Sequence, residues 1–451
     1  MRHPKIIIAG LGVALAAAVA TGSAASTSRA AAASSARGTA ATVRVAGALA
    51  GTAAAASTAG TLDPTFGKNG IVLANQGFPA AAVLQSNGDI VVAVGSGSPG
   101  SGLARFLPNG ARDATFGNGG FAALPNLGIP SVHPGLAVQS DGKLVWAGEA
   151  TAGNGTGSTF AVVRFNANGT LDQGFGAGAL ATTTFPVFNA SVQGAQTVLI
   201  QPDGKILVGG ENITGNPSGT SRAPETFGAL ARFNADGSID TSFGTGGQVQ
   251  VGNSDFTVLG LDASGDIFTL PSHLEFSPAG QPDATLTPAA ITTASHNGTV
   301  TFLPSGGFVV ATTVGSSRSS DHDVQVTRFN PDGSTAATAT GIDYAGQNGA
   351  LAASDGAAAV AIQANGQAVI GGTHTESGQF SSTSVFGLAR FNADSSLDPA
   401  FGTGGVLTTR IQGHDSVSLL VIQPDGKILA IGTSQNAAGV QELALARYLS
   451  Q

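Results

Sequence analysis

The chain contains no cysteine, and charged residues make up only 10% of its 451 residues. The missing cysteine excludes a disulfide scaffold, a thiol nucleophile and a cysteine-ligated zinc site. Aromatic residues other than phenylalanine are rare, with one Trp and two Tyr beside 23 Phe. Continuous helical periodicity is also absent, whereas 66 Gly and 20 Pro favour many turns. These features predict a turn-rich β protein without covalent cross-links.

Acidic residues dominate beyond the first 60 positions. The formal net charge is −8, although residues 1–60 contain basic residues and no acidic one. The remainder of the chain is therefore more acidic than the average indicates. Such a surface repels nucleic acid and anionic membranes. We expect no nucleic-acid partner, and no membrane association once a leader has been removed.

The N-terminal residues have the pattern of a secretory signal peptide. Arg2 and Lys5 form a basic start, residues 6–20 are apolar or small, and small residues follow near position 25. The apolar run of about 15 residues is short for a membrane span, and an uncleaved anchor is the alternative. Alanine, serine, threonine and glycine then dominate residues 26–60. We predict a signal peptide at 1–25, a flexible linker at 26–60 and a secreted domain at 61–451.

The chain from Leu62 onward repeats itself. The clearest copies of a first motif are TVLIQPDGKILVGG at 197–210 and SLLVIQPDGKILAIG at 418–432. A second motif follows each first one, as in LARFNADGSIDTSFGTGG at 230–247 and LARFNADSSLDPAFGTGG at 388–405. Each motif reads as a hairpin, because an apolar strand leads into a Pro-Asp-Gly or Asn/Asp-Gly turn and a second strand. Four short strands repeated about every 60 residues are typical of propeller blades.

Seven first hairpins can be counted, but one fourth strand is missing after the last unit. A matching segment without its own blade, LDPTFGKNGIVL, lies at 62–73. We therefore predict an all-β fold, a seven-bladed propeller of four-stranded blades. It is closed by pairing 62–73 with about 443–449, which would remove two exposed sheet edges.

These units resemble the delta-60 repeat family in the Gln-Pro-Asp-Gly-Lys-Ile turn and in the Leu-Ala-Arg-Phe-Asn-x-Asp-Gly-Ser-x-Asp-x-x-Phe-Gly stretch. The resemblance covers nearly all of 62–451 and implies a propeller of a secreted or surface bacterial protein. It implies no catalytic residue. The fourth and fifth units depart from the motif, with Glu275 in place of arginine and no Phe-Gly after Gly333.

Arginine and aspartate recur eight residues apart, and the offset spans the second hairpin. The pairs are Arg105 and Asp113, Arg164 and Asp172, Arg232 and Asp240, and Arg390 and Asp398. Arg447 would find the equivalent acid in Asp63 on the closing strand. We expect one structural ion pair or Asp-capped turn per blade, in place of a ring of ligand-binding arginines. Asx-turn chemistry explains the Asn-x-Asp-Gly turns better than calcium binding, because they lack the EF-hand ligand string.

The histidines beyond the leader cluster at one face of the predicted ring. Strand alternation puts the two repeated turns on one face and the irregular second-to-third and blade-to-blade loops on the other. Loops on a rigid scaffold are where binding residues usually lie. The candidate binding residues on this irregular face are His296, Asp321, His322, Asp323, His374, Glu376, His414 and Asp415. The same composition also fits ordinary exposed loops, and no residue is assigned a catalytic or metal-ligating role.

Three functions are compatible with this pattern. The favoured interpretation is a monomeric, non-enzymatic binding scaffold whose partner is an extracellular protein or a cell-wall glycan. It rests on the absence of a Gly-x-Ser-x-Gly elbow, a His-Glu-x-x-His string and a phosphate loop. The alternatives are a lyase or hydrolase with a histidine–acid site at the channel mouth, and a purely structural surface protein. No cofactor is expected, although imidazoles beside carboxylates could hold a divalent metal.

Overall fold

A computed structural model describes residues 7–9 and much of 58–451. The residues left out beyond 58 are 96–99, 129–133, 152–156, 187–191, 214–224, 253–255, 262–264, 272–273, 283–297, 304, 316–321, 332, 345–352 and 378–381. The described residues form strands and turns and contain no helix. Within them, no helix is long and apolar enough to cross a membrane.

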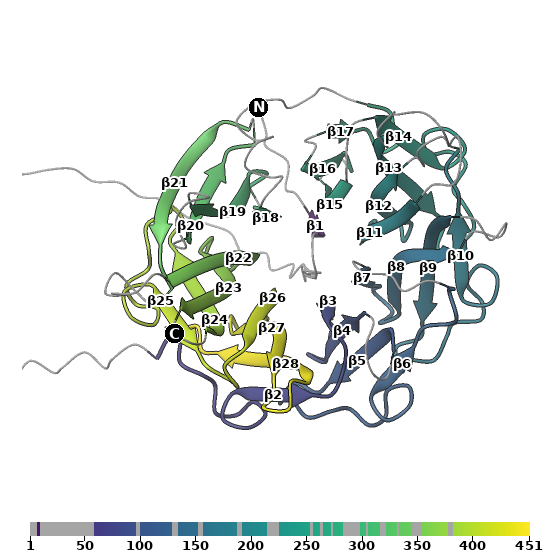
Figure 1. The fold of residues 1–451 in the computed structure, drawn as a ribbon. Coiled ribbons are helices and arrows are strands. Elements are labelled where there is room, and N and C mark those ends of the chain that lie inside the picture. The colour runs from purple at the N-terminus through teal and green to yellow at the C-terminus, as the bar shows by residue number, and fades with distance from the viewer. Residues whose placement is uncertain are drawn as a thin grey trace, which may run out of the picture.

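Antiparallel sheets are arranged around a common centre, with strands β3, β7, β11, β18, β22 and β26 toward that centre (Figure 1). The first three sheets follow the chain order. They are β3 (Pro79–Leu84), β4 (Ile90–Val94), β5 (Gly102–Phe106) and β6 (Phe121–Ala123); β7 (Gly135–Val138), β8 (Leu144–Thr151), β9 (Ser158–Phe165) and β10 (Leu180–Thr183); and β11 (Val192–Ile200), β12 (Ile206–Ile213), β13 (Thr226–Phe233) and β14 (Gln248–Gly252).

The next sheets are less regular. Strands β15 (Phe256–Leu261), β16 (Ile267–Pro271) and β17 (Leu274–Phe276) form a sheet that β1 (Ile7–Ala9) extends by pairing with β15. Strands β18 (Gly298–Phe302), β19 (Phe308–Gly315), β20 (His322–Phe329) and β21 (Thr335–Ile342) form one group, and β22 (Ala353–Ile362), β23 (Ala368–Ser377), β24 (Ser382–Phe391) and β25 (Val406–Thr409) form the next. A single parallel bridge between His322 and Ser354 joins these two groups.

The last sheet combines distant parts of the chain. It contains β26 (Asp415–Ile422), β27 (Ile428–Gln435), β28 (Gln441–Tyr448) and, as its outer strand, β2 (Ile71–Ala74). Strand β2 runs antiparallel to β28, with Ile71 opposite Ala446 and Ala74 opposite Leu443. Segment 62–73, which the sequence predicts to be a fourth strand, thus contributes its last residues to this pairing.

The hydrophobic core lies between neighbouring sheets. Trp146 on β8 is 1% exposed and shares a cluster with Val91 on β4 and Phe116. In another cluster, Val92 on β4 packs with Leu445 on β28. The inner strands are apolar on both faces because each sheet is covered on both sides, which explains their uninterrupted apolar runs.

The first turn of each unit explains the Gln-Pro-Asp-Gly-Lys motif. Between β11 and β12, Gln201 N donates to Lys205 O at 2.8 Å and Gly204 N donates to Gln201 O at 2.9 Å. Asp203 Oδ1 accepts a hydrogen bond from Lys205 N at 3.1 Å, which is an Asx turn. Gly204 has φ +83°, a conformation that other residues adopt at a cost.

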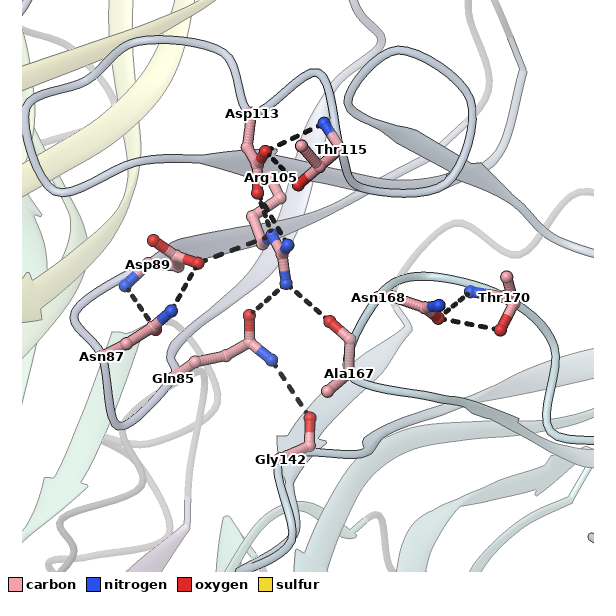
Figure 2. A network of polar contacts seen from close by, with 10 residues as sticks. All are labelled: Gln85, Asn87, Asp89, Arg105, Asp113, Thr115, Gly142, Ala167, Asn168 and Thr170. Atoms are coloured by element: carbon pink, nitrogen blue, oxygen red, sulfur yellow. Dashed lines mark hydrogen bonds and ion pairs between the residues drawn. The ribbon is translucent and has the colours of Figure 1, made fainter.

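The repeated arginine forms what we call the arginine latch: an Arg, the Asp eight residues later and the Phe of the Phe-Gly pair. Figure 2 shows Arg105 between Asp113 and the neighbouring sheet. Its Nε donates to Asp113 Oδ2 at 2.8 Å, its NH1 group donates to Gln85 Oε1 at 2.9 Å and to the Ala167 carbonyl, and its guanidinium lies 4.5 Å from the Phe116 ring centre. Ala167 belongs to the turn after β9, so the latch ties two sheets together.

Latches with the same contacts occur in five sheets. They are Arg105–Asp113–Phe116, Arg164–Asp172–Phe175, Arg232–Asp240–Phe243, Arg390–Asp398–Phe401 and Arg447–Asp63–Phe66. The prediction of a structural Arg–Asp pair is confirmed at these positions. Arg328 lacks the acid, as the sequence indicates, and its Nε has no hydrogen-bond partner among the described residues.

The fifth latch lies where the two ends of the repeat region meet. Gly60 N donates to Leu449 O at 2.8 Å, and Leu449 N donates to Thr61 O at 2.9 Å. The continuous turn after β13 has the same two bonds, from Gly237 N to Asn234 O and from Asn234 N to Ser238 O. Two separate segments, 58–61 and 449–451, therefore make up a turn that other units build from consecutive residues.

Candidate active site

The sequence-predicted site residues fall in different environments. His296 and Asp321 lie outside the described residues. His322 and Asp323 are the first two residues of β20, and His374 and Glu376 lie in β23. His414 directly precedes β26, and Asp415 is the first residue of that strand.

The expectation that His374 and Glu376 lie in an irregular second-to-third loop is wrong. Strands β23 and β24 continue to the pair Ser377–Ser382, so His374 and Glu376 belong to a long hairpin. The threonines flanking His374 favour extended backbone, and pairing on both sides of β23 holds that conformation. His374 is consequently 2% exposed and not a loop residue open to solvent.

His374 forms the centre of a polar group with two aspartates. Asp355 lies opposite it on β22, and His374 Nδ1 and Asp355 Oδ1 are joined by a hydrogen bond of 2.7 Å. Asp343 Oδ1 lies 3.8 Å from the same nitrogen. The side chains of His374 and Asp355 are 3% and 2% exposed, whereas that of Asp343 is 20% exposed. Asp343 therefore connects an otherwise buried group to solvent.

Tyr344 directly follows Asp343 and packs against Gly387 on β24. It is 1% exposed, and its ring lies so close to Gly387 that a Cβ there would be 2.3 Å from the ring. The Tyr344 N–H donates to the Asp355 carboxylate. The Tyr344 hydroxyl is buried without a hydrogen-bond partner among the described residues. Burial and the nearby Asp355 charge both raise the pKa of this phenol, so the hydroxyl keeps its proton.

The surroundings of Asp355 make ionisation of its carboxyl less favourable. Burial raises the pKa of this carboxyl above its usual value, and the negative charge of Asp343 raises it further. The hydrogen bond and charge of His374 act in the opposite direction. A carboxyl whose pKa is raised next to an imidazole can exchange protons nearer neutral pH, which is what acid–base catalysis requires.

The other predicted residues do not join this group. Asp415 is fully buried, and its carboxylate accepts hydrogen bonds from the backbone N–H groups of residues 411–413 and from Ser434 Oγ at 2.6 Å. Its role is to fix the segment before β26. His414 is exposed, and its carbonyl accepts from Gln435 N at 3.0 Å. His322 Nδ1 lies 3.4 Å from Ser354 Oγ, next to Asp355 in the chain.

Asp343, Tyr344 and Asp355 were not predicted from the sequence. The repeat units nevertheless share a pattern at the position of Asp355. Asp355 lies two residues before the β-bulge of its inner strand, the same place as Gln193 on β11 and Asp415 on β26. The residue opposite each is polar: His374, Asn212 and Ser434 respectively. Aligning the inner strands on the bulge would have revealed this repeated polar pair.

The repeat units match one known protein family. The family described as "Domain of unknown function (DUF5122) beta-propeller" matches residues 85–116, 139–175, 201–243, 363–401 and 423–451. The chain carries β-propeller repeats. Four of the matched stretches run from the Gln of a first turn to the Phe of a latch. The propeller region around β15–β21 falls between matched stretches, where the sequence departs from the motif.

Solved propeller-like structures match at low identity. Puromycin hydrolase is 12% identical with a TM-score of 0.43, and the match covers 85% of this chain and 54% of that one. The chain thus spans about half the length of that enzyme. A protein of unknown function from Dyadobacter fermentans is 14% identical, with a TM-score of 0.37 and coverage of 86% and 100%. An α-L-arabinofuranosidase from Fusarium graminearum is 10% identical, with a TM-score of 0.37 and coverage of 87% and 97%. No curated protein matches the chain.

These comparisons correct the functional expectation drawn from the sequence. A non-enzymatic binding scaffold was favoured, whereas two of these solved structures are a puromycin hydrolase and an α-L-arabinofuranosidase. The absence of familiar sequence motifs did not exclude enzymes, because propeller sites combine residues from separate repeats that no short motif records. The matches bring no substrate and no catalytic residue to this chain, so its own geometry must supply them.

Proposed function

We propose that this protein is a hydrolase in which Asp343, Asp355 and His374 activate water. The observation that carries the proposal is the 2.7 Å hydrogen bond between buried His374 and Asp355, with Asp343 3.8 Å from the same nitrogen. A carboxylate beside an imidazole holds the ring in place and stabilises its positive charge. Enzymes often use such a pair to take a proton from a nucleophile. The partly exposed Asp343 supplies the side from which water and substrate approach.

The chemistry follows from the positions of these groups. A water molecule at Asp343 transfers a proton to the His374–Asp355 pair while its oxygen attacks the electrophilic atom of the substrate. The bond to the leaving group then breaks, and that group departs with the proton returned by the pair. The net reaction adds one water: its hydroxyl goes to one product and its hydrogen to the other. The raised pKa of Asp355 favours the uptake of the proton from water by the pair.

The proposed scaffold is a closed seven-bladed propeller of the delta-60 type. Supporting it, β2 pairs with β28, Arg447 Nε donates to Asp63 Oδ2 at 3.0 Å, and the guanidinium lies 4.5 Å from the Phe66 ring centre. The first sheet also packs on the last through the cluster around Leu445. The leader pattern at 1–25 supports secretion, and an extracellular substrate is therefore proposed.

Turnover of chromogenic substrates tests the activity. Wild-type protein is expected to hydrolyse at least one member of a panel of p-nitrophenyl esters, glycosides, phosphates and aminoacyl anilides. His374→Asn and Asp355→Gln are each expected to lower kcat/KM at least 100-fold, since acid–base groups contribute about 10²–10⁴-fold. Both replacements occur naturally at the equivalent positions of the β11–β12 pair, where Gln193 faces Asn212, so the strands can accommodate them.

Asn212→Ala provides the matched control. Asn212 occupies on β12 the place that His374 occupies on β23, and it is likewise fully buried. This variant is expected to keep kcat/KM within twofold of wild type. No turnover of any panel member, or equal turnover by wild type and His374→Asn, would contradict the proposal.

A further inference from the structure

We infer that Asp343, Asp355 and His374, with the Tyr344 hydroxyl beside them, form a binding site for one zinc ion. The inference rests on the proposed function, since the ion would be the means by which this group activates water. One ligand atom from each of the three residues lies within 4.8 Å of the others. The three come from the segment after β21 and from two paired strands, so the backbone fixes their relative positions.

The interatomic distances suit a small cation. Zinc bonds of about 2.0–2.1 Å to imidazole nitrogen and carboxylate oxygen give ligand–ligand distances of about 3.3 Å in a tetrahedron. The distances from His374 Nδ1 to Asp355 Oδ1 and to Asp343 Oδ1 are 2.7 Å and 3.8 Å, one on each side of that value.

The balance of charge also favours a cation. The latch aspartates each face an arginine, as Asp113 faces Arg105 with 2.6 Å between oxygen and nitrogen. Asp415, which occupies the place of Asp355 in the last sheet, is instead satisfied by three N–H groups and a hydroxyl. Asp355 has the His374 imidazole and the Tyr344 N–H, and it shares its surroundings with a second carboxylate. A divalent ion would neutralise the two charges at their source.

The buried Tyr344 hydroxyl is an independent indication of a ligand. Buried hydroxyl groups are rarely left without a partner in folded proteins, yet this one has none among the described residues. It lies close enough to Asp355 for the carboxylate charge to act on it. A Cβ at residue 372 would be 3.0 Å from the hydroxyl oxygen, so the glycine there leaves room around it. A water molecule held by the metal would give the hydroxyl its partner.

The equivalent positions in another sheet show which residue types are sufficient for packing alone. Before and within β11–β12, the places of Asp343, Tyr344, Asp355 and His374 are taken by Thr184, Phe185, Gln193 and Asn212. Phe185 is buried like Tyr344, and its N–H donates to Gln193 Oε1 at 2.9 Å, as the Tyr344 N–H donates to Asp355. The packing is therefore achieved without any ionisable group. In the β22–β23 sheet, three of these places carry an ionisable carboxylate or imidazole, and the fourth gains the Tyr344 hydroxyl.

One imidazole nitrogen and two carboxylate oxygens are ligands that favour zinc over calcium. Calcium takes six to eight oxygen ligands, whereas zinc accepts imidazole and carboxylate at four positions. Three protein ligands leave the fourth position for water, which is the composition of catalytic zinc sites. The partly exposed side chain of Asp343 puts that position toward solvent. Zinc would lower the pKa of its water to about 7 and so supply the nucleophile.

Zinc binding by the full chain tests the inference. The protein is treated with a chelator, dialysed and titrated with zinc in competition with a colorimetric chelator, and bound metal is counted by mass spectrometry. We expect one zinc per chain, retained in millimolar calcium. His374→Asn and Asp355→Gln should weaken binding at least 100-fold, and Tyr344→Phe about 10-fold, as removal of an outer partner does. Asn212→Ala should bind within twofold of wild type.

The outcomes separate this inference from the proposed function. Zinc bound equally by wild type and His374→Asn, or not bound by the wild type, overturns the inference. In the second case, chelator-resistant turnover that His374→Asn abolishes would leave the hydrolase proposal intact. One zinc bound through His374 without turnover of any substrate supports the inference and counts against the hydrolase.

Discussion

Removal of residues 58–74 is expected to abolish the folded state of the repeat region. The deletion takes the outer strand from β28, the Asp63 partner from buried Arg447 and the Phe66 ring from the core. An uncompensated buried charge alone costs about 3–5 kcal/mol, and the loss of a buried Phe costs a similar amount. Together they approach the whole stability of an ordinary domain, about 5–15 kcal/mol. Size-exclusion chromatography and urea unfolding should show aggregation or loss of the cooperative transition.

A circular permutant is the control for this deletion. Ser450 and Ala59 take the places of Ala235 and Asp236 in the turn after β13, because the Arg390 NH1 group donates to Ser450 O and Gly402 N donates to Ala59 O. Joining Ser450 directly to Ala59, and opening the exposed turn between Ala437 and Ala438, would make that turn continuous. The permutant should unfold within about 2 kcal/mol of wild type. A monomeric deletion variant as stable as wild type would contradict the closed ring.

Arg232→Ala should cost about 3–5 kcal/mol of unfolding free energy, the effect of removing one member of a buried ion pair. Arg232 is 6% exposed, and its Nε donates to Asp240 Oδ2 at 2.7 Å. It also donates to the Pro278 carbonyl of the next sheet and lies 4.6 Å from the Phe243 ring centre. Truncation leaves the Asp240 carboxylate without its guanidinium and removes a tie between two sheets. Urea unfolding measures the change.

Lys205→Ala tests whether any positive charge next to Asp240 stabilises the fold as much as the buried Arg232 does. The Lys205 ammonium lies 3.0 Å from the same Asp240 oxygen, but its side chain is 30% exposed. Solvent screens such a pair, so its loss should cost under about 1 kcal/mol. Equal losses for the two variants would show that the latch is no more than surface electrostatics.

The repeat made the scaffold predictable from the sequence. The eight-residue offset of Arg232 and Asp240 placed them on opposite sides of one hairpin turn, and the structure brings them together. The Pro-Asp-Gly turns were predictable because Pro and Gly restrict the backbone in opposite ways. The contacts of 58–61 were not, since small residues carry no pattern and their partners lie almost 400 positions away, as Leu449 does from Gly60.

The site was predictable only in part. His374 was predicted among the binding residues of the irregular face, but in a loop and not in a buried strand. Asp355 and Asp343 were missed because their proximity to His374 depends on the register of β22 against β23 and on the segment after β21, where the motif is weakest. The densest predicted group also included Asp415, whose carboxylate is fully occupied by the chain's own N–H groups. Composition cannot separate a capping carboxylate from a reactive one, whereas hydrogen-bond partners can.

The polar group of Asp343, Asp355 and His374 is proposed to be reactive, in contrast to the structural cap at Asp415. The most direct measurement compares wild type with the variant Asp343→Thr, Tyr344→Phe, Asp355→Gln and His374→Asn, which gives β22–β23 the residues of β11–β12. This variant should unfold within about 2 kcal/mol of wild type and should lose zinc binding and at least 99% of turnover. A variant that keeps its turnover, or one that fails to fold, would contradict the claim and assign the group to the scaffold.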